Sequence, residues 1–149
     1  MFLRSEECLK FLKKSWRGIL ALCDNGKPYA FPVAYILYRD VPHFLFLKYG
    51  RKMKIIEKNP NACYLVYIEE DRKVVSILIE GILEYVENVD VVKDVVRKFV
   101  EEIFPRDPYF KNLKNIDIDK LVNDIISRKI PGIYRLEISN ISCVVEYYD

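Results

Sequence analysis

Basic side chains gather around one glycine in the segment LKYGRKMKIIEKNP, residues 47–60. The cations of this segment are Lys48, Arg51, Lys52, Lys54 and Lys58, against a single acid, Glu57. Arg51 and Lys52 directly follow Gly50, where a predicted strand ends and a predicted helix begins. Free backbone N–H groups and the helix dipole favour a phosphate at such a junction, and arginine can bind it through two parallel hydrogen bonds. The pattern indicates an anion site, although a charge run is also typical of a solvated helix edge.

Other patterns of catalytic residues are weak. Ser76 has no histidine in a recognisable triad motif, and the only histidine, His43, follows Pro42 at a predicted turn, so a serine hydrolase is not favoured. The acids from Glu69 to Asp71 fall at another predicted turn, where carboxylates more often solubilise a hairpin. One histidine and four scattered cysteines give no zinc-ligand spacing, so no metal site is expected.

The composition is that of one globular domain over residues 1–149. Hydrophobic residues make up 51% of the chain and the formal net charge is +2, which is too small to favour a nucleic-acid partner. The apolar runs fall short of the roughly 20 residues that span a bilayer, so no membrane partner is expected. The cysteines form no C-x-x-C pair and no signal segment precedes them, which favours a cytoplasmic protein.

The elements that must position the basic cluster can be read from periodicity. Asn25 and Gly26 separate two apolar runs, which predicts an antiparallel hairpin over residues 17–38 with a tight type I′ turn. Its second strand is apolar on both faces, so barrel closure or dimerisation should cover it. Around the hairpin we expect a helix capped by Ser5 that carries Cys8, Leu9, Leu12 and Trp16, a turn over residues 39–42, a strand over residues 43–49 and a helix over residues 52–58.

The second half of the chain repeats this mixture of strands and helices. We expect strands at 62–70, 74–87 and 133–148, and amphipathic helices at 90–104 and 117–128. Gly81, inside the second of these strands, indicates a β-bulge. The order predicts a mainly β, α+β protein, with an antiparallel barrel of meander type and helices added at its periphery.

Three segments, in this order, resemble the FMN-binding split-barrel superfamily, which includes pyridoxamine-phosphate oxidase and the nitroimidazole-resistance flavoproteins. They are GILALCDNGKPYAFPVAYILY at 18–38, GRKMKIIEKNP at 50–60 and VVSILIEGILEYV at 74–86. The resemblance covers about residues 17 to 87 and implies a Greek-key-like split β-barrel with peripheral helices.

The resemblance also implies a cofactor, FMN, and a homodimer with two flavin sites at its interface. It places Arg51 and Lys52 on the FMN phosphate, and Lys48 and Tyr49 next to the phosphate and ring. The segment Pro32, Val33 and Ala34 would run beside the isoalloxazine ring, and Ser76 would hydrogen-bond the flavin or its phosphate chain.

The sequence departs from the best-known members of this superfamily. No histidine follows His43, so the C-terminal Arg and His motif of true pyridoxamine-phosphate oxidases is missing. Lys48 stands where nitroimidazole-resistance relatives often carry a histidine. We therefore expect an FMN-dependent oxidoreductase of some other small molecule. Two alternatives remain open: a non-catalytic carrier of flavin, deazaflavin or haem, and, less favoured, a nucleic-acid-binding barrel.

Overall fold

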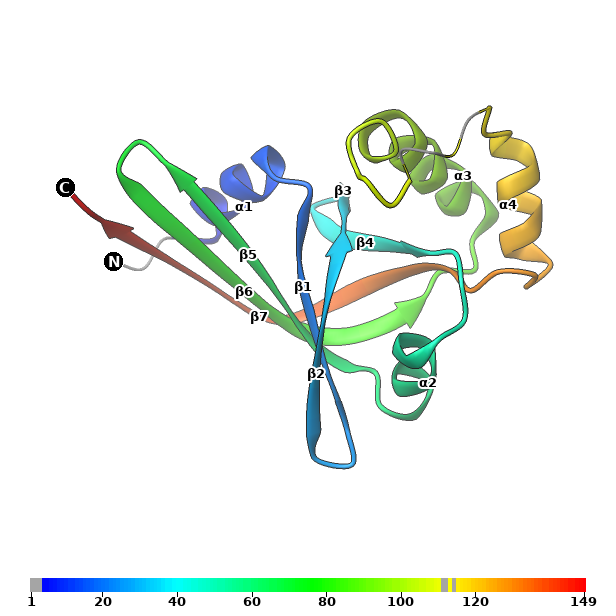
Figure 1. Ribbon diagram of the computed structural model, residues 1–149, viewed down its shortest axis with the longest axis horizontal. Helices are drawn as coiled ribbons and strands as arrows, with labels where there is room; N and C mark the ends of the chain where they lie inside the picture. The colour runs from blue at the N-terminus through cyan, green and yellow to red at the C-terminus, as the bar shows by residue number, and fades with distance from the viewer. Residues whose placement is uncertain (1–3, 111–112, 114) are drawn as a thin grey trace.

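A computed structural model describes residues 4–110, 113 and 115–149, the side chain of Ser5 excepted. The elements are α1 (Ser5–Lys14), β1 (Arg17–Asp24), β2 (Lys27–Ala34), β3 (Ile36–Tyr38), β4 (Val41–Phe46), α2 (Arg51–Lys58), β5 (Asn61–Glu70), β6 (Lys73–Tyr85), α3 (Val89–Lys98), a π-helical turn η1 (Phe99–Ile103), α4 (Ile118–Ile126) and β7 (Gly132–Tyr147). All strands join one antiparallel sheet in the order β2-β1-β5-β6-β7-β4-β3 (Figure 1).

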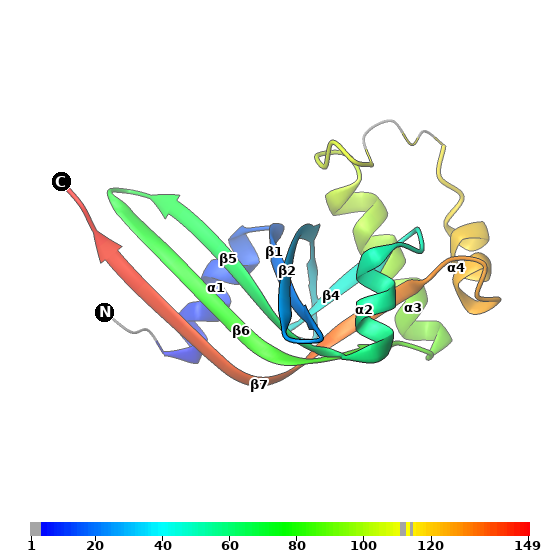
Figure 2. The same ribbon diagram turned by 60° about the horizontal axis from the view of Figure 1, so that its bottom comes forward.

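The sheet curls into a partly closed barrel. Its long strands β6 and β7 bend strongly along their length (Figure 2), so that β2 and β4 approach each other although they lie near opposite ends of the strand order. The register of β6 and β7 shifts between Glu80 and Gly81, which leaves Ser139 of β7 unpaired, and such a bulge bends the strands. A Cβ on Gly81 would lie 2.0 Å from the backbone oxygen of Glu137, so only glycine allows this close approach. The predicted bulge and split barrel are confirmed.

The first hairpin forms as the turn chemistry predicts, but it is shorter than expected. Asn25 and Gly26 both have positive φ, 51° and 77°, as a type I′ turn requires. The predicted second strand is interrupted at Tyr35, and the residues after it form β3, which pairs with β4 instead. The interruption depends on residues distant in sequence: the Tyr35 backbone N–H donates to the carbonyl of Trp16, and the Tyr35 side chain is buried in the core.

Two hydrophobic cores lie on different parts of this sheet. One fills the inside of the curled sheet, beneath α1 and α2, and the other packs α3 and α4 against β3, β4 and β7. The predicted helix at 90–104 is α3 continued by η1, and the predicted helix at 117–128 is α4, which Asp117 caps through the backbone N–H of Lys120. Helices α3 and α4 therefore cover one end of the barrel, next to β3 and β4.

Three local predictions were wrong. Arg4, not Ser5, occupies the N-cap position of α1, and Trp16 lies beyond the end of that helix. The strand expected at 43–49 is β4, which begins at Val41 and ends at Phe46, so Lys48 and Tyr49 lie in the connection to α2.

Over the described part of the chain, the structure contains no helix with the length and apolar character needed to cross a membrane.

Candidate functional site

A cavity of about 330 Å³ opens where β2 and β4 meet the helical end of the barrel. One wall comes from β2, β4 and the start of α2. The other comes from the start of β1 and the residue before it, from η1, and from the segment that follows η1. Its lining residues are Trp16, Arg17, Pro32, Val33, Ala34, Leu45, Phe46, Leu47, Lys48, Lys52, Phe99, Asp107, Pro108, Tyr109 and Phe110.

Five of the eight predicted site residues line this cavity. The β2 segment from Pro32 to Ala34 forms one wall, while Lys48 and Lys52 supply positive charge beside it. The curl of the sheet brings β2 close to β4, so that the last residues of β2 line the cavity together with residues of β4. A strand of small side chains thus borders a basic corner.

Lys52 is the most informative residue of that corner. Its ammonium group lies 5.6 Å from the ring centroid of Phe31 and 5.4 Å from that of Phe46. The side chain is half-buried, and burial lowers the pKa of the Lys52 ammonium. No acidic side chain among the described residues forms an ion pair with it. A partly desolvated cation without a counter-ion favours an anionic ligand in the cavity.

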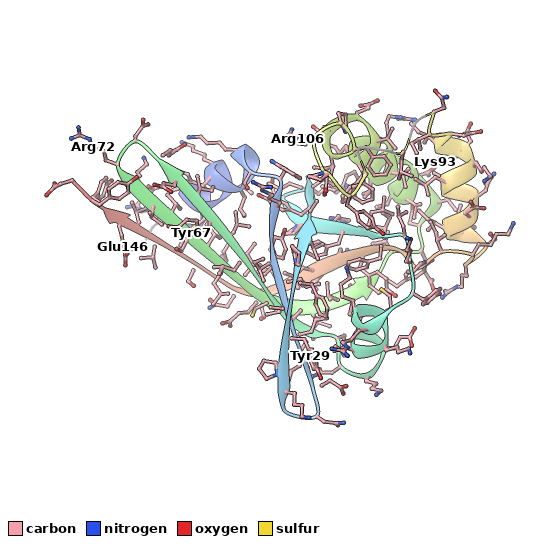
Figure 3. All side chains as sticks on the ribbon, in the orientation of Figure 1. Tyr29, Tyr67, Arg72, Lys93, Arg106 and Glu146 are labelled. Carbon is pink, nitrogen blue, oxygen red and sulfur yellow. The ribbon has the colours of Figure 1, made fainter. Side chains whose placement is uncertain are left out.

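Arg51 and Tyr49 lie beside the cavity rather than in its lining. Arg51 is the first residue of α2, and its guanidinium lies 5.4 Å from the ring centroid of Tyr29, which Figure 3 shows next to α2. Tyr49 is exposed in the loop before this helix. Gly50 occupies the N-cap position and offers no side-chain acceptor, so the first N–H groups of α2 are without a side-chain cap. Arg51 and the helix start therefore extend the basic corner outward.

Ser76 is not brought to this cavity. It lies in the middle of β6 between Tyr67 of β5 and Val144 of β7, and its side chain points to the outer face because Val75 and Ile77 point into the core. Figure 3 shows Tyr67 on the long β5–β6 hairpin, well away from Tyr29 and α2. Within one chain, Ser76 cannot contact a ligand in the cavity.

The second wall of the cavity was not found from the sequence. It consists of Trp16 just before β1, Arg17 at the first position of β1, Phe99 in η1, and the segment from Asp107 to Phe110. The segment is held by stacking of Phe110 on Phe104, with ring centroids 4.3 Å apart, and by the Asp107 carboxylate, which accepts from the Tyr109 backbone N–H. A cluster of aromatic residues after a helix-ending proline was the only signal available, and it does not specify a location.

His43 lies outside this cavity. The residue is not at a turn, as expected, but inside β4, paired with Ile36 and Arg135. It is buried and lines a separate cavity of about 240 Å³, together with residues such as Tyr38 and Arg135. Its Nδ1 lies 2.8 Å from the carbonyl oxygen of Val41, and burial lowers the pKa of the imidazole. The only histidine of the chain is therefore not part of the candidate site.

Comparison with known sequences decides the family. The sequence profile described as pyridoxamine 5'-phosphate oxidase matches residues 4–129, which is most of the chain. The chain belongs to this pyridoxamine 5'-phosphate oxidase family. No curated protein sequence is significantly similar to it.

Solved structures of this family's fold resemble the chain over its whole length. An FAD-binding protein from Mesorhizobium loti is 18% identical, with 99% of this chain and 98% of that chain covered and a TM-score of 0.73. An FAD-binding protein from Mycobacterium smegmatis is 13% identical, with 99% of both chains covered and a TM-score of 0.70. A haem-binding protein from Mycobacterium smegmatis is 14% identical, covers 95% of this chain and 55% of that chain, and has a TM-score of 0.61. At these identities, the likeness establishes the fold.

Proposed function

We propose that the cavity binds a flavin nucleotide, with FMN as the expected cofactor, and that the protein is a flavin-dependent oxidoreductase of a small molecule. The observation that carries the proposal is the half-buried Lys52, without an acidic partner among the described residues, beside the β2 wall of the cavity. The two FAD-binding proteins of the same fold support a flavin as the ligand class.

The basic residues and the β2 wall fit different parts of a flavin nucleotide. Lys48, Lys52 and Arg51 would hold the phosphate together with the uncapped N–H groups of α2. The wall from Pro32 to Ala34 presents backbone and small side chains, which permit close approach of a flat ring. The bound flavin supplies the electron-transfer chemistry, and these residues bind, orient and shield it.

The ligand can be identified by titrating the purified protein, freed of bound small molecules, with FMN, FAD and haemin in parallel. We expect FMN fluorescence to be quenched and its visible bands to shift on binding at micromolar concentration or below. Saturation by haemin alone would replace this proposal with haem carriage, which the haem-binding neighbour makes the second candidate. If the protein binds flavin but neither NADH nor NADPH reduces the bound flavin, the protein is a flavin carrier and not an oxidoreductase that uses these donors.

We also propose that the protein is a homodimer, because the outer face of the sheet carries a continuous apolar row. Pro32, Ile19, Leu65 and Leu78 are consecutive cross-strand partners on β2, β1, β5 and β6. Cross-strand partners point to the same face, and in a single chain this face is open to solvent, with Leu65 39% exposed. A second copy of the chain would cover the row and the outer face of β2.

The dimer would also explain where Ser76 acts. Ser76 lies on the same outer face as the apolar row, so it would face the partner subunit. Pro32 belongs both to this row and to the cavity wall, so the partner would reach the edge of the flavin site. The predicted contact between Ser76 and a flavin is then a contact across the interface.

A further inference from the structure

A buried tyrosine reaches from the middle of the sheet to the cavity wall. Tyr64 of β5 is fully buried, and its hydroxyl donates a hydrogen bond to the carbonyl oxygen of Val33. Two aromatic neighbours fix the ring: Tyr35 packs edge-on with ring centroids 5.4 Å apart, and Phe44 lies at 4.9 Å. The hydroxyl therefore has little freedom to leave the Val33 carbonyl.

Gly18 of β1 makes room for this reach. A Cβ built on Gly18 would lie 2.8 and 2.9 Å from two atoms of the Tyr64 ring, and 2.5 Å from the backbone oxygen of Leu65. Gly18 is also the cross-strand partner of Val33. The absence of a side chain at Gly18 thus lets the Tyr64 ring pass beneath β1 and bond the strand on its far side.

The bonded strand is the wall of the candidate site. β2 lies at one end of the strand order, so only β1 pairs with it along the sheet. We infer, on the basis of the proposed flavin site, that Tyr64 is a positioning residue. Its hydroxyl holds the segment from Pro32 to Ala34 at the distance from α2 that a flavin ring requires. Tyr64 itself does not line the cavity.

Tyr35 provides a matched control. It is also a buried tyrosine of the same aromatic cluster, and its hydroxyl donates a 2.6 Å hydrogen bond to a backbone carbonyl, that of Leu12. Leu12 belongs to α1 and does not line the cavity. Tyr64→Phe and Tyr35→Phe therefore remove the same chemical group from the same core, but only the first frees the cavity wall.

The experiment compares wild type, Tyr64→Phe and Tyr35→Phe in two measurements. Hydrogen exchange by mass spectrometry, on protein without flavin, follows the peptides that cover β2. Titration with FMN measures the dissociation constant and the visible absorption of the bound flavin. We expect Tyr64→Phe to speed exchange in β2 and to weaken FMN binding roughly three- to tenfold, the range of one net hydrogen bond, with a shifted flavin spectrum. Tyr35→Phe should leave all three unchanged.

The following results would contradict the inference about Tyr64 or the proposed function on which it rests. Equal FMN affinity in the two variants would overturn it, even if their thermal stabilities fall, because loss of a core hydrogen bond alone would then explain the data. If wild type binds no flavin, the proposed function fails while the exchange measurement still stands. In that case, unchanged exchange of β2 in Tyr64→Phe would show that Tyr64 does not position this strand.

Discussion

The cations of the 47–60 segment differ in their position relative to the cavity: Lys48 and Lys52 line it, and of these two only Lys52 is half-buried. Lys52 is half-buried against Phe31 and Phe46, whereas Lys54 and Lys58 of the same helix are exposed and do not line the cavity. Lys54 and Lys58 thus fit the solvated helix edge, while the anion site proposed at Lys52 stays a prediction.

Replacing Arg51 and Lys52 together by alanine should weaken FMN binding on the order of a hundredfold or more. The reason is that charge-assisted hydrogen bonds contribute roughly 1.5–3 kcal/mol each. The measurement is a fluorescence titration, with circular dichroism to verify the fold. The Lys54→Ala/Lys58→Ala variant removes the same net charge from the same helix and should bind FMN within about twofold of wild type. Equal losses in the two double variants would show that only the general positive potential matters.

His43 should make the folded state sensitive to acid. Burial lowers the pKa of the folded imidazole below its ordinary value of 6.5, so the unfolded chain binds more protons as the pH falls through 6.5. The free energy of unfolding should therefore decrease from pH 7 toward pH 5, down to the folded pKa. Urea unfolding at several pH values tests this, and His43→Gln, which cannot titrate, should show a shallower decrease. Identical pH profiles would contradict the assignment.

At the scale of elements, periodicity and turn chemistry predicted most of what surrounds the site. The Asn25–Gly26 turn, the helix after Gly50 and the bulge at Gly81 each have a local cause that single residues reveal. The interruption at Tyr35 and the aromatic wall after η1 have causes that lie far away in sequence. Tyr35 looks like one more apolar residue of a strand until the carbonyl of Trp16 and the core are in place.

The residues of the candidate site also fall into two groups, those that a local sequence pattern indicates and those that depend on contacts distant in sequence. Lys48, Lys52 and the β2 wall belong to continuous segments with a recognisable order, so they could be predicted. The wall from Trp16 and the segment from Asp107 to Phe110 depends on how α3 packs on the sheet, which no local pattern specifies. Ser76 was assigned to the site by resemblance, and its strand directs it to the outer face.

The glycine in β6 gives a test of the barrel's curvature. Gly81→Ala should destabilise the protein by about 1–3 kcal/mol, because its Cβ would overlap the backbone of Glu137 and force β6 and β7 apart. Thermal and urea unfolding measure the change. Gly50→Ala is the control, since its φ of −169° suits any residue and nothing lies within 4 Å of the added Cβ. It should alter the free energy of unfolding by less than about 0.5 kcal/mol.

At the scale of the whole molecule, the outer apolar row decides the expected assembly. We expect light scattering at micromolar concentration to give twice the 17.7 kDa chain mass. Leu65→Lys should shift the protein to monomer, because it places a charge at the centre of the row. Ile126→Lys, at a similarly exposed apolar residue of α4, should not. A wild-type monomer would remove the dimer proposal, and it would leave Ser76 without a role at the flavin site.

The break at Tyr35 has a mechanical consequence for the cavity. β2 and β3 are the two ends of the strand order, yet one residue joins them, so the seam of the barrel is closed by a covalent link. Successive Cα atoms are about 3.8 Å apart, which limits how far the two ends can separate at this point. Ala34, next to the link, lines the cavity. This link therefore limits how far the cavity can widen at Ala34, whereas the Asn25–Gly26 turn lies at the end of β2 farthest from the link.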